Sequence, residues 1–273
     1  MKNLLKKNNL DDLILYMKAR TDLDLNRYRP TTLGRRISHR MRVRGFSDME
    51  EYINCIYSDP SELDNLIEEI TIKVTEFFRD RDVFNCLARK VIPALIENKI
   101  QSGEPDITIW SAGCSTGEEA YSIAMLLADR IGGTGIRARV LGTDISSVSC
   151  RLAGKGEYSA ENILRIPDEL RRKYVIKNNS RFAISAPVRK LVSFRVHNLF
   201  MSAPLEKVDM VLCRNVIIHF KYNYREEVLK NFSSVLTPAG FLMLGKSEAV
   251  SGSSHSLFRI VSPSIKLYRK AAG

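Results

Sequence analysis

The sequence has no long apolar run and few of the residues that disulfide frameworks and metal sites require. No window of its 273 residues reaches the roughly 18 consecutive apolar residues that a membrane helix needs, and charged residues interrupt the first apolar stretch, so no signal peptide is indicated. The five cysteines include no C-x-x-C pair, and only four histidines are present. We therefore expect a cytoplasmic protein with no membrane insertion, no disulfide framework and no metal.

Acidic residues are in the minority. Lysine and arginine number 42 against 31 aspartate and glutamate, a formal net charge of +11, which favours an anionic partner or substrate. Seven arginines and no acid lie between Arg27 and Arg44, and eleven basic residues against four acids lie between Arg151 and Arg195. With 44% hydrophobic and 27% charged residues, the composition is typical of a globular protein of one large or two modest domains.

The first eighty residues predict helices and no strand. Apolar residues recur at helical spacing over 10–17, over 33–41, and over 63–74 and on to Phe77 and Phe78. The third stretch opens at Asp59-Pro60, a cap residue followed by proline in the first turn. Residues 1–80 are therefore expected to form a small helical domain.

From Asp106 onward, strands alternate with helices. The pattern predicts strands at 107–110, 139–143, 208–213 and 241–244, an edge strand at 265–268, helices at 118–131 and 223–236, and a turn at 237–240. This alternation predicts an α/β fold with a mostly parallel, doubly wound sheet over residues 81–273. Residues from about 155 to 194 interrupt it with two short β-like runs, 182–184 and 191–194, and are expected to form an inserted β subdomain.

A loop of small residues, 111–117, follows the first strand. Its glycines let the backbone approach a ligand, and Asp144 at the end of the next strand stands where a carboxylate accepts hydrogen bonds from ribose hydroxyls. The third glycine of the dinucleotide fingerprint is missing, and Glu118 opens the following helix. A carboxylate there repels a pyrophosphate but accepts a hydrogen bond from a cationic amino group. The loop therefore favours a cofactor that carries an amino acid, such as S-adenosylmethionine, over a nicotinamide cofactor.

Four motifs in order resemble the CheR family of chemotaxis receptor methyltransferases. They are TEFFRD at 75–80, WSAGCSTGEEAYSIA at 110–124, CRNVIIHF at 213–220 and LGKSE at 244–248. The resemblance covers nearly the whole chain from the arginine-rich helix to the end. It implies a helical N-terminal domain joined to a Rossmann-like methyltransferase domain that binds S-adenosylmethionine and contains an inserted β subdomain. It also implies O-methylation of glutamate side chains on the cytoplasmic helices of chemoreceptors, with S-adenosylhomocysteine as the second product.

The resemblance also implies roles for individual residues. Those expected to bind the cofactor are Thr75 and Arg79 at its methionine end, Gly113 in the loop, Glu118 at its amino group, Asp144 at the ribose, Asn198 and Leu199 at the adenine, and Asn215 and Val216 at the methyl-transfer pocket. A glutamate with a pKa of about 4.3 is ionised at pH 7 and needs no general base. Arg79 and Asn215 are therefore expected to act in catalysis by positioning alone. Two residues depart from the common pattern: Lys73 stands where many members have Asn, and His219 where Tyr is frequent.

Arginines at i, i+4 and i+8 of the basic helix, Arg36, Arg40 and Arg44, form a cationic stripe. By analogy with the family, this stripe would dock the acidic methylation helices of a receptor. The basic residues of the inserted subdomain would either grip a tether peptide at a receptor C-terminus, as in some members, or form a plain surface patch.

Two other functions are compatible with this fold. The sequence pI of about 9.5 suits an RNA or DNA methyltransferase, but Arg214 to Ile217 stand where such enzymes carry an Asn/Asp-Pro-Pro-aromatic motif, so no nucleic-acid partner is expected. A non-catalytic regulator could keep the cofactor fold as a binding module. Retention of Arg79, Glu118 and Asp144 argues against that alternative.

Overall fold

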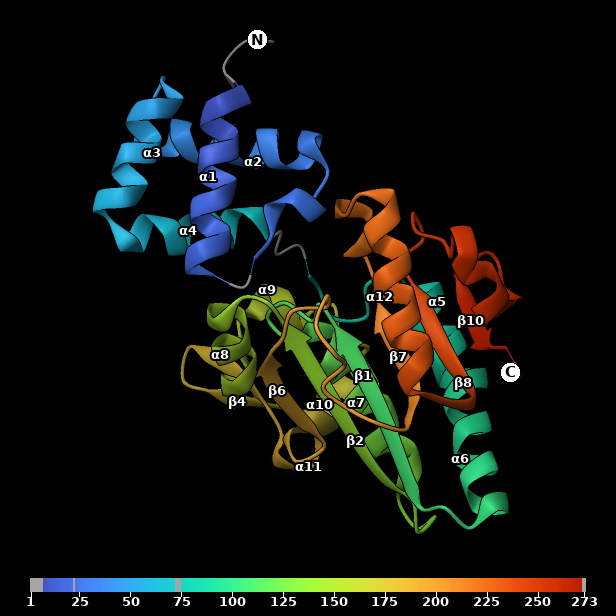
Figure 1. Ribbon diagram of the computed structural model, residues 1–273. Coiled ribbons are helices and arrows are strands. Elements are labelled where there is room, and N and C mark those ends of the chain that lie inside the picture. The colour runs from blue at the N-terminus through green and yellow to red at the C-terminus, as the bar shows by residue number, and fades with distance from the viewer. Residues whose placement is uncertain (1–6, 22, 72–74, 272–273) are drawn as a thin grey trace. The chain divides into compact units, whose positions relative to one another are not determined.

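The chain folds into two compact units. The computed structural model describes residues 7–21, 23–71 and 75–271 (Figure 1). One unit, called here the helical unit, comprises Met1–Lys73 and Ile218–Arg225, and the other, the sheet unit, comprises Val74–Ile217 and Glu226–Gly273. The division lies at Lys73 and Val74 and not at residue 80, because Phe77 and Phe78 belong to the hydrophobic core of the sheet unit.

Four α-helices build the helical unit: α1 (Lys7–Arg20), α2 (Pro30–Arg44), α3 (Met49–Ser58) and α4 (Pro60–Ile70), with the short 3₁₀ turn η1 (Leu25–Arg27) before α2. Local chemistry sets their ends: Asp48 and Asp59 cap α3 and α4 by accepting backbone N–H bonds, and Gly45 ends α2 at φ +80°. The apolar stripe on α4 was expected to continue to Phe78, which is wrong: α4 ends at Ile70. The expected helices omitted α3.

A segment from late in the chain completes the helical unit. Phe220 forms an isolated antiparallel bridge with Tyr28, and the backbone N–H of Arg29 donates to the carbonyl of His219 at 2.8 Å. The Arg225 guanidinium donates to the carbonyls of Phe220 and Ile218. Ile218–Arg225 therefore folds as part of this unit although it comes only a few residues after the central strand β7 (Val208–Cys213).

The main sheet of the other unit has seven strands: β1 (Asp106–Ala112), β2 (Arg137–Asp144), β6 (Val192–Val196), β7 (Val208–Cys213), β8 (Leu236–Leu244), β9 (Phe258–Ser262) and β10 (Leu267–Lys270). They lie in the order β6-β2-β1-β7-β8-β10-β9 (Figure 1). Neighbouring strands pair in parallel from β6 to β8, whereas β10 pairs antiparallel with both β8 and β9. β7 is buried at every position and β1 at all but its first residue, as expected for strands covered on both faces.

Three details of the sheet differ from the sequence-based expectation. The run at 191–194 overlaps β6, which pairs with β2 at an edge of the main sheet and is not part of the inserted subdomain. The expected edge strand at 265–268 overlaps β10, which lies inside the sheet because β9 pairs with its outer side. The expected turn at 237–240 lies within β8, where the pairing register with β7 shifts.

The helices of the sheet unit are α5 (Arg81–Cys86), the π-helical stretch η2 (Leu87–Val91), α6 (Ile92–Ser102), α7 (Glu118–Ile131), α8 (Ser147–Lys155) and most of α12 (Tyr222–Val235), with the 3₁₀ turn η4 (Gly252–Leu257). The 3₁₀ turn η3 (Ile217–His219) begins at the last residue of this unit before the chain enters the helical unit. α6 packs on β1 and α7 on β2, so both place their apolar residues in the sheet core. None of the described helices combines the length and the apolar run needed to cross a membrane.

An insertion between β2 and β6 forms a second, small sheet. It contains β3 (Glu157–Tyr158), α9 (Ala160–Ile163), α10 (Asp168–Tyr174), β4 (Val175–Asn178), β5 (Arg181–Ile184) and α11 (Ala186–Arg189). The strands are antiparallel in the order β3-β5-β4, which leaves β4 at an edge. The whole is an α/β fold with a helical N-terminal unit and an inserted β element.

Candidate functional site

The carboxyl ends of the parallel strands meet at one edge of the main sheet. From β1 the chain moves outward to β2 and β6 and then returns to β7 on the other side of β1. β1 is therefore the topological switch point, beside which open α/β sheets bind their ligands. The predicted cofactor residues that follow or end these strands are Gly113, Asp144, Asn198, Leu199, Asn215 and Val216.

The loop after β1 has no room for side chains at its glycines. Gly113 has φ +78°, and a Cβ added to it would lie 2.4 Å from Cγ2 of Val216 in the loop after β7. Gly117 has φ +96°, and its Cβ would lie 2.9 Å from Cβ of Ala153. The loops after β1 and β7 therefore touch at Gly113, so the predicted residues Gly113 and Val216 are neighbours.

Asp144 joins the loops on the other side of β1. Its carboxylate accepts the backbone N–H of Ser115 at 2.8 Å and that of Ser146 at 2.9 Å, which fixes its orientation. Its backbone carbonyl accepts the N–H of His197 at 2.9 Å, so Asn198 and Leu199 follow directly from that contact. A carboxylate oxygen can accept more than one hydrogen bond, so the carboxylate can also accept ribose hydroxyls.

Glu118, in the first turn of α7, is only 3% exposed. Its carboxylate accepts a hydrogen bond from the Thr116 hydroxyl at 2.7 Å and one from the Thr75 side chain. Burial raises the pKa of Glu118, and these hydrogen bonds oppose the rise. No cation among the described residues forms an ion pair with this carboxylate, so the arrangement fits a ligand that carries a cationic amino group.

The segment that carries Thr75 and Arg79 is attached to α7 and β7. The backbone N–H of Phe78 donates to the Ser122 hydroxyl at 3.0 Å. Arg214, which directly follows β7 and is 7% exposed, donates to the Arg79 carbonyl at 3.0 Å and to the carboxylate of Asp80. Through its other terminal nitrogen Arg214 contacts Glu119 at 3.2 Å, so one guanidinium links three segments of the predicted site.

Asn215 has a left-handed backbone with φ +62°. Its backbone N–H donates to Glu248 Oε2 at 2.8 Å, whereas its side-chain oxygen is buried without a hydrogen-bond partner. A buried acceptor without a donor is costly, so it is a second feature that fits a ligand at this edge. Neither Arg214 nor Glu248 was assigned a role from the sequence; the available signal was a charged residue close after the carboxyl end of a buried strand.

The arginine stripe of the helical unit faces acids of α4. The Arg40 guanidinium binds Glu62 with two hydrogen bonds of 2.7 and 2.6 Å, and the Arg44 Nε atom lies 3.4 Å from the same carboxylate. Arg36 forms an ion pair of 3.1 Å with Glu69. The three arginines predicted to dock the substrate are therefore paired within the unit, and their docking role stays a prediction.

Two family models match the chain: "CheR methyltransferase, all-alpha domain" over residues 8–71 and "CheR methyltransferase, SAM binding domain" over residues 73–266. The chain belongs to the CheR methyltransferase family. The expected family, the Rossmann-like methyltransferase fold with its helical N-terminal domain, and S-adenosylmethionine as the cofactor are confirmed.

Relatives in the CheR family match most of the chain. A chemotaxis protein methyltransferase of Borreliella burgdorferi is 32% identical over 91% of this chain and 90% of the relative. One from Listeria innocua is 30% identical over 86% of this chain and 87% of the relative. An uncharacterized 104.1 kDa protein of Rhodobacter capsulatus is 33% identical over 82% of this chain, which covers only 23% of that protein. The match therefore extends over most of two relatives and over one part of a longer one.

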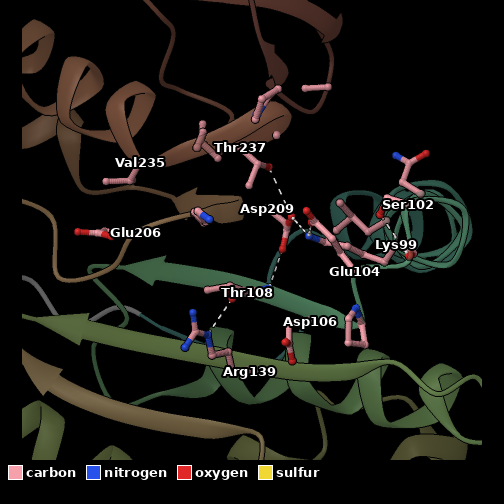
Figure 2. A pocket seen from close by; sticks show the side chains of 18 of the residues that line it. Lys99, Ser102, Glu104, Asp106, Thr108, Arg139, Glu206, Asp209, Val235 and Thr237 are labelled. Carbon is pink, nitrogen blue, oxygen red and sulfur yellow. Dashed lines mark hydrogen bonds and ion pairs between the residues drawn. The ribbon is translucent and has the colours of Figure 1, made fainter.

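A large hollow of about 1070 Å³ lies at the opposite edge of the CheR sheet, where the strands begin. Figure 2 shows Asp209 in this hollow, linked to Thr108, Lys99 and Thr237. Arg139 donates to the Thr108 hydroxyl at 2.7 Å. None of the predicted cofactor residues lines this hollow, and its labelled interactions join neighbouring elements of the fold.

Of the two residues that depart from the common family pattern, Lys73 lies outside the described residues.

Proposed function

We propose that this methyltransferase transfers the methyl group of S-adenosylmethionine to glutamate side chains on the cytoplasmic helices of chemoreceptors, which produces glutamyl methyl esters. The observation that carries the proposal is the buried Glu118 carboxylate, which has hydroxyl partners and no ion pair to a described cation, in the first turn of α7 directly after the loop that is joined to Asp144. The name that the relatives carry, chemotaxis protein methyltransferase, supports a chemoreceptor as the substrate.

Each predicted residue at this edge of the sheet would bind a different part of the cofactor. Glu118 would accept its amino group and Asp144 its ribose hydroxyls. Thr75 and Arg79 would hold its methionine end, with Asn198 and Leu199 beside the adenine. The bound cofactor supplies an electrophilic methyl group. Asn215 and Val216 would line the place of transfer, where the chain must align the acceptor oxygen and exclude water.

The protein does not need to remove a proton from its acceptor. A glutamate side chain is ionised at pH 7 and attacks as a carboxylate. Burial raises the pKa of both Cys114 and Cys213 above the ordinary value, so these two thiols at the same edge stay protonated and do not compete as nucleophiles. Arg79 and Asn215 accordingly act by positioning.

The positive charge of the α2 arginines would attract the acidic receptor helices to the helical unit. Arg35 and Arg42 of α2 are exposed, and neither forms an ion pair with a residue that the structure describes. We infer that they contribute to docking of acidic receptor helices together with the partly exposed Arg36 and Arg44, whereas Arg40 mainly stabilises the fold. A substrate of this kind places the enzyme in the cytoplasm.

The inserted sheet could hold a second part of the receptor. Its edge strand β4 carries Ile176, which is 56% exposed beside a hollow of about 540 Å³. An extended peptide can add to such an edge by main-chain hydrogen bonds, which supports the proposal of a C-terminal tether peptide.

Transfer of a radiolabelled methyl group to a receptor cytoplasmic fragment tests the proposal. Label should appear in the fragment and be released as volatile methanol by mild alkali, because esters hydrolyse and methylated amines do not. A matched fragment whose acceptor glutamates are replaced by alanine should remain unlabelled. Alkali-stable label, or label in added RNA or DNA, would contradict glutamate O-methylation.

A further inference from the structure

The loops after β7 and β8 are joined by one buried carboxylate. Glu248 is 2% exposed, and its Oε2 atom accepts the backbone N–H of Asn215 at 2.8 Å and that of Gly245 at 2.7 Å. The Glu248 backbone N–H in turn donates to the Gly245 carbonyl at 2.9 Å. A single oxygen atom thus connects the loops that follow two neighbouring parallel strands, at the second residue after β7 and the first after β8.

The hydrogen bond from the Asn215 backbone N–H to Glu248, called here the anchor, holds Asn215 in an unfavourable backbone conformation. Its φ of +62° lies in the left-handed region, which asparagine tolerates better than most residues but which still persists only when the surroundings hold it. Its buried side-chain oxygen accepts no hydrogen bond, so this atom does not help to hold the residue in place. The bond from its backbone N–H to a buried carboxylate is of the strong, charge-assisted kind.

The anchor fits without spare room. A Cβ added to Gly245 would lie 2.7 Å from Glu248 Oε2 and 2.8 Å from the Asn215 nitrogen. Both distances are shorter than carbon makes to these atoms, so any side chain at position 245 would push the carboxylate and Asn215 apart. The position of the Asn215 backbone therefore depends on both the Glu248 carboxylate and the absence of a side chain at Gly245.

We propose that Glu248 is a positioning residue for methyl transfer, which it serves by holding Asn215 in its left-handed conformation. The proposal rests on the function proposed above, in which Asn215 lines the place of transfer. Alignment of acceptor and methyl group is the main task of such a site, and a displacement of about 1 Å can cost on the order of 100-fold in rate. Of the residues assigned to the cofactor, Glu118 lies in α7 and Asp144 ends β2, whereas Glu248 joins the loops after β7 and β8.

Three variants test the proposal. Glu248→Ala should lower kcat on the receptor fragment by about 10- to 100-fold, while KM for the fragment and Kd for S-adenosylhomocysteine change by less than about threefold. Glu248→Gln should retain kcat within about fivefold, because one amide oxygen can accept both N–H groups that Oε2 accepts. Gly245→Ala retains the Glu248 side chain, but the added methyl group displaces its carboxylate. This variant should therefore reproduce the kcat loss of Glu248→Ala.

Glu226 provides a matched control. It also binds a loop through a carboxylate, accepting the backbone N–H of Ser253 at 3.3 Å and its hydroxyl at 2.6 Å, but it makes no described contact with Asn215. Glu226→Ala should leave kcat unchanged. Wild-type kcat in folded Glu248→Ala or in Gly245→Ala overturns the proposal, as does a Glu248→Gln enzyme as slow as Gly245→Ala.

A direct readout separates this proposal from the proposed function. The backbone amide of Asn215 should exchange slowly with deuterium in the wild type and in Glu248→Gln, and at least about tenfold faster in Gly245→Ala. This measurement needs no receptor. If the wild type does not methylate receptor fragments, the proposed function fails while the exchange result still decides whether Glu248 holds Asn215. Equal exchange in all variants refutes the anchor even if methylation is observed.

Discussion

Two buried glutamates, one in each unit, show how the same side chain serves different ends. Glu62 on α4 is 0% exposed and accepts hydrogen bonds from Arg40 at 2.7 and 2.6 Å and from the Tyr52 hydroxyl at 2.9 Å. Glu118 on α7 is 3% exposed, and its described side-chain partners are threonine hydroxyls. A buried carboxylate that the fold supplies with cations stabilises the fold, whereas one supplied with hydroxyls alone is suited to a cation that arrives with a ligand.

Glu62→Ala should have the largest effect on stability. It leaves the Arg40 guanidinium, whose side chain is 17% exposed, and the Tyr52 hydroxyl without their partner. Removal of one member of a buried pair costs about 3–5 kcal/mol, and denaturant unfolding measures it. Glu62→Met combined with Arg40→Met replaces the pair by apolar side chains and should recover most of the loss. A cost below about 1 kcal/mol in the single variant would show that Glu62 does not hold the unit together.

Glu118→Gln should have the opposite signature. The unliganded protein should not lose stability, because burial of this carboxylate is compensated by no described ion pair. Binding of S-adenosylhomocysteine should weaken by about 30- to 100-fold, roughly 2–3 kcal/mol, because a charge-assisted bond to the amino group is lost. Isothermal calorimetry measures the affinity and thermal unfolding the stability. Loss of stability with unchanged affinity would place Glu118 in the same class as Glu62.

His219 extends the comparison to a partly buried basic side chain, which lies near arginines and so near charges of the sign that it would itself acquire. Burial and the charges of Arg36, Arg35, Arg29 and Arg225 lower its pKa from 6.5 to about 4. Between these values the unfolded chain binds more protons than the folded one, so stability is greatest above pH 6.5 and falls as the pH decreases toward 4. Since the imidazole is only partly buried, we expect about 1–2 kcal/mol over this window.

Urea unfolding of the wild type and of His219→Asn over this pH range measures the effect. The variant lacks the titrating imidazole, so the difference between the two stability curves isolates His219 from the carboxylates that also titrate near pH 4. Parallel curves would mean that neither burial nor the nearby arginines lower the pKa of His219 in the folded protein.

The places in the fold of Gly113, Glu118 and Asp144, whose role in cofactor binding stays a prediction, could be predicted from the sequence because their signals are local. A strand, a loop with Gly113, a helix opening with Glu118 and a second strand ending at Asp144 lie within forty residues, and their order along the chain sets their order in the sheet. The positions of β6, β9 and β10 depend instead on which strands pair across the sheet, and short β-like runs do not specify their partners.

The arginine pairing could not be predicted for a related reason. Arg40 and Glu62 are 22 residues apart and Arg36 and Glu69 are 33 apart, on helices whose packing angle no periodicity reveals. A stripe at i, i+4 and i+8 predicts which side chains share a face, but not whether that face meets solvent or another helix. The roles of Arg214 and Glu248 likewise depend on contacts between segments far apart in sequence.

The smallest expected effect concerns the arginines of α2 that have no acid partner among the described residues. Arg35→Glu combined with Arg42→Glu should raise KM for the receptor fragment by about fivefold, about 1 kcal/mol, with stability and cofactor affinity unchanged. The effect should shrink as salt is raised from roughly 0.05 M to roughly 0.5 M, because exposed charges are screened. Arg130→Glu combined with Arg259→Glu makes the same change in net charge on exposed residues of the sheet unit and should leave KM unchanged. Equal KM changes in both double variants would mean that net charge, and not the face of α2, attracts the substrate, and the division between structural and docking arginines would then have no kinetic counterpart.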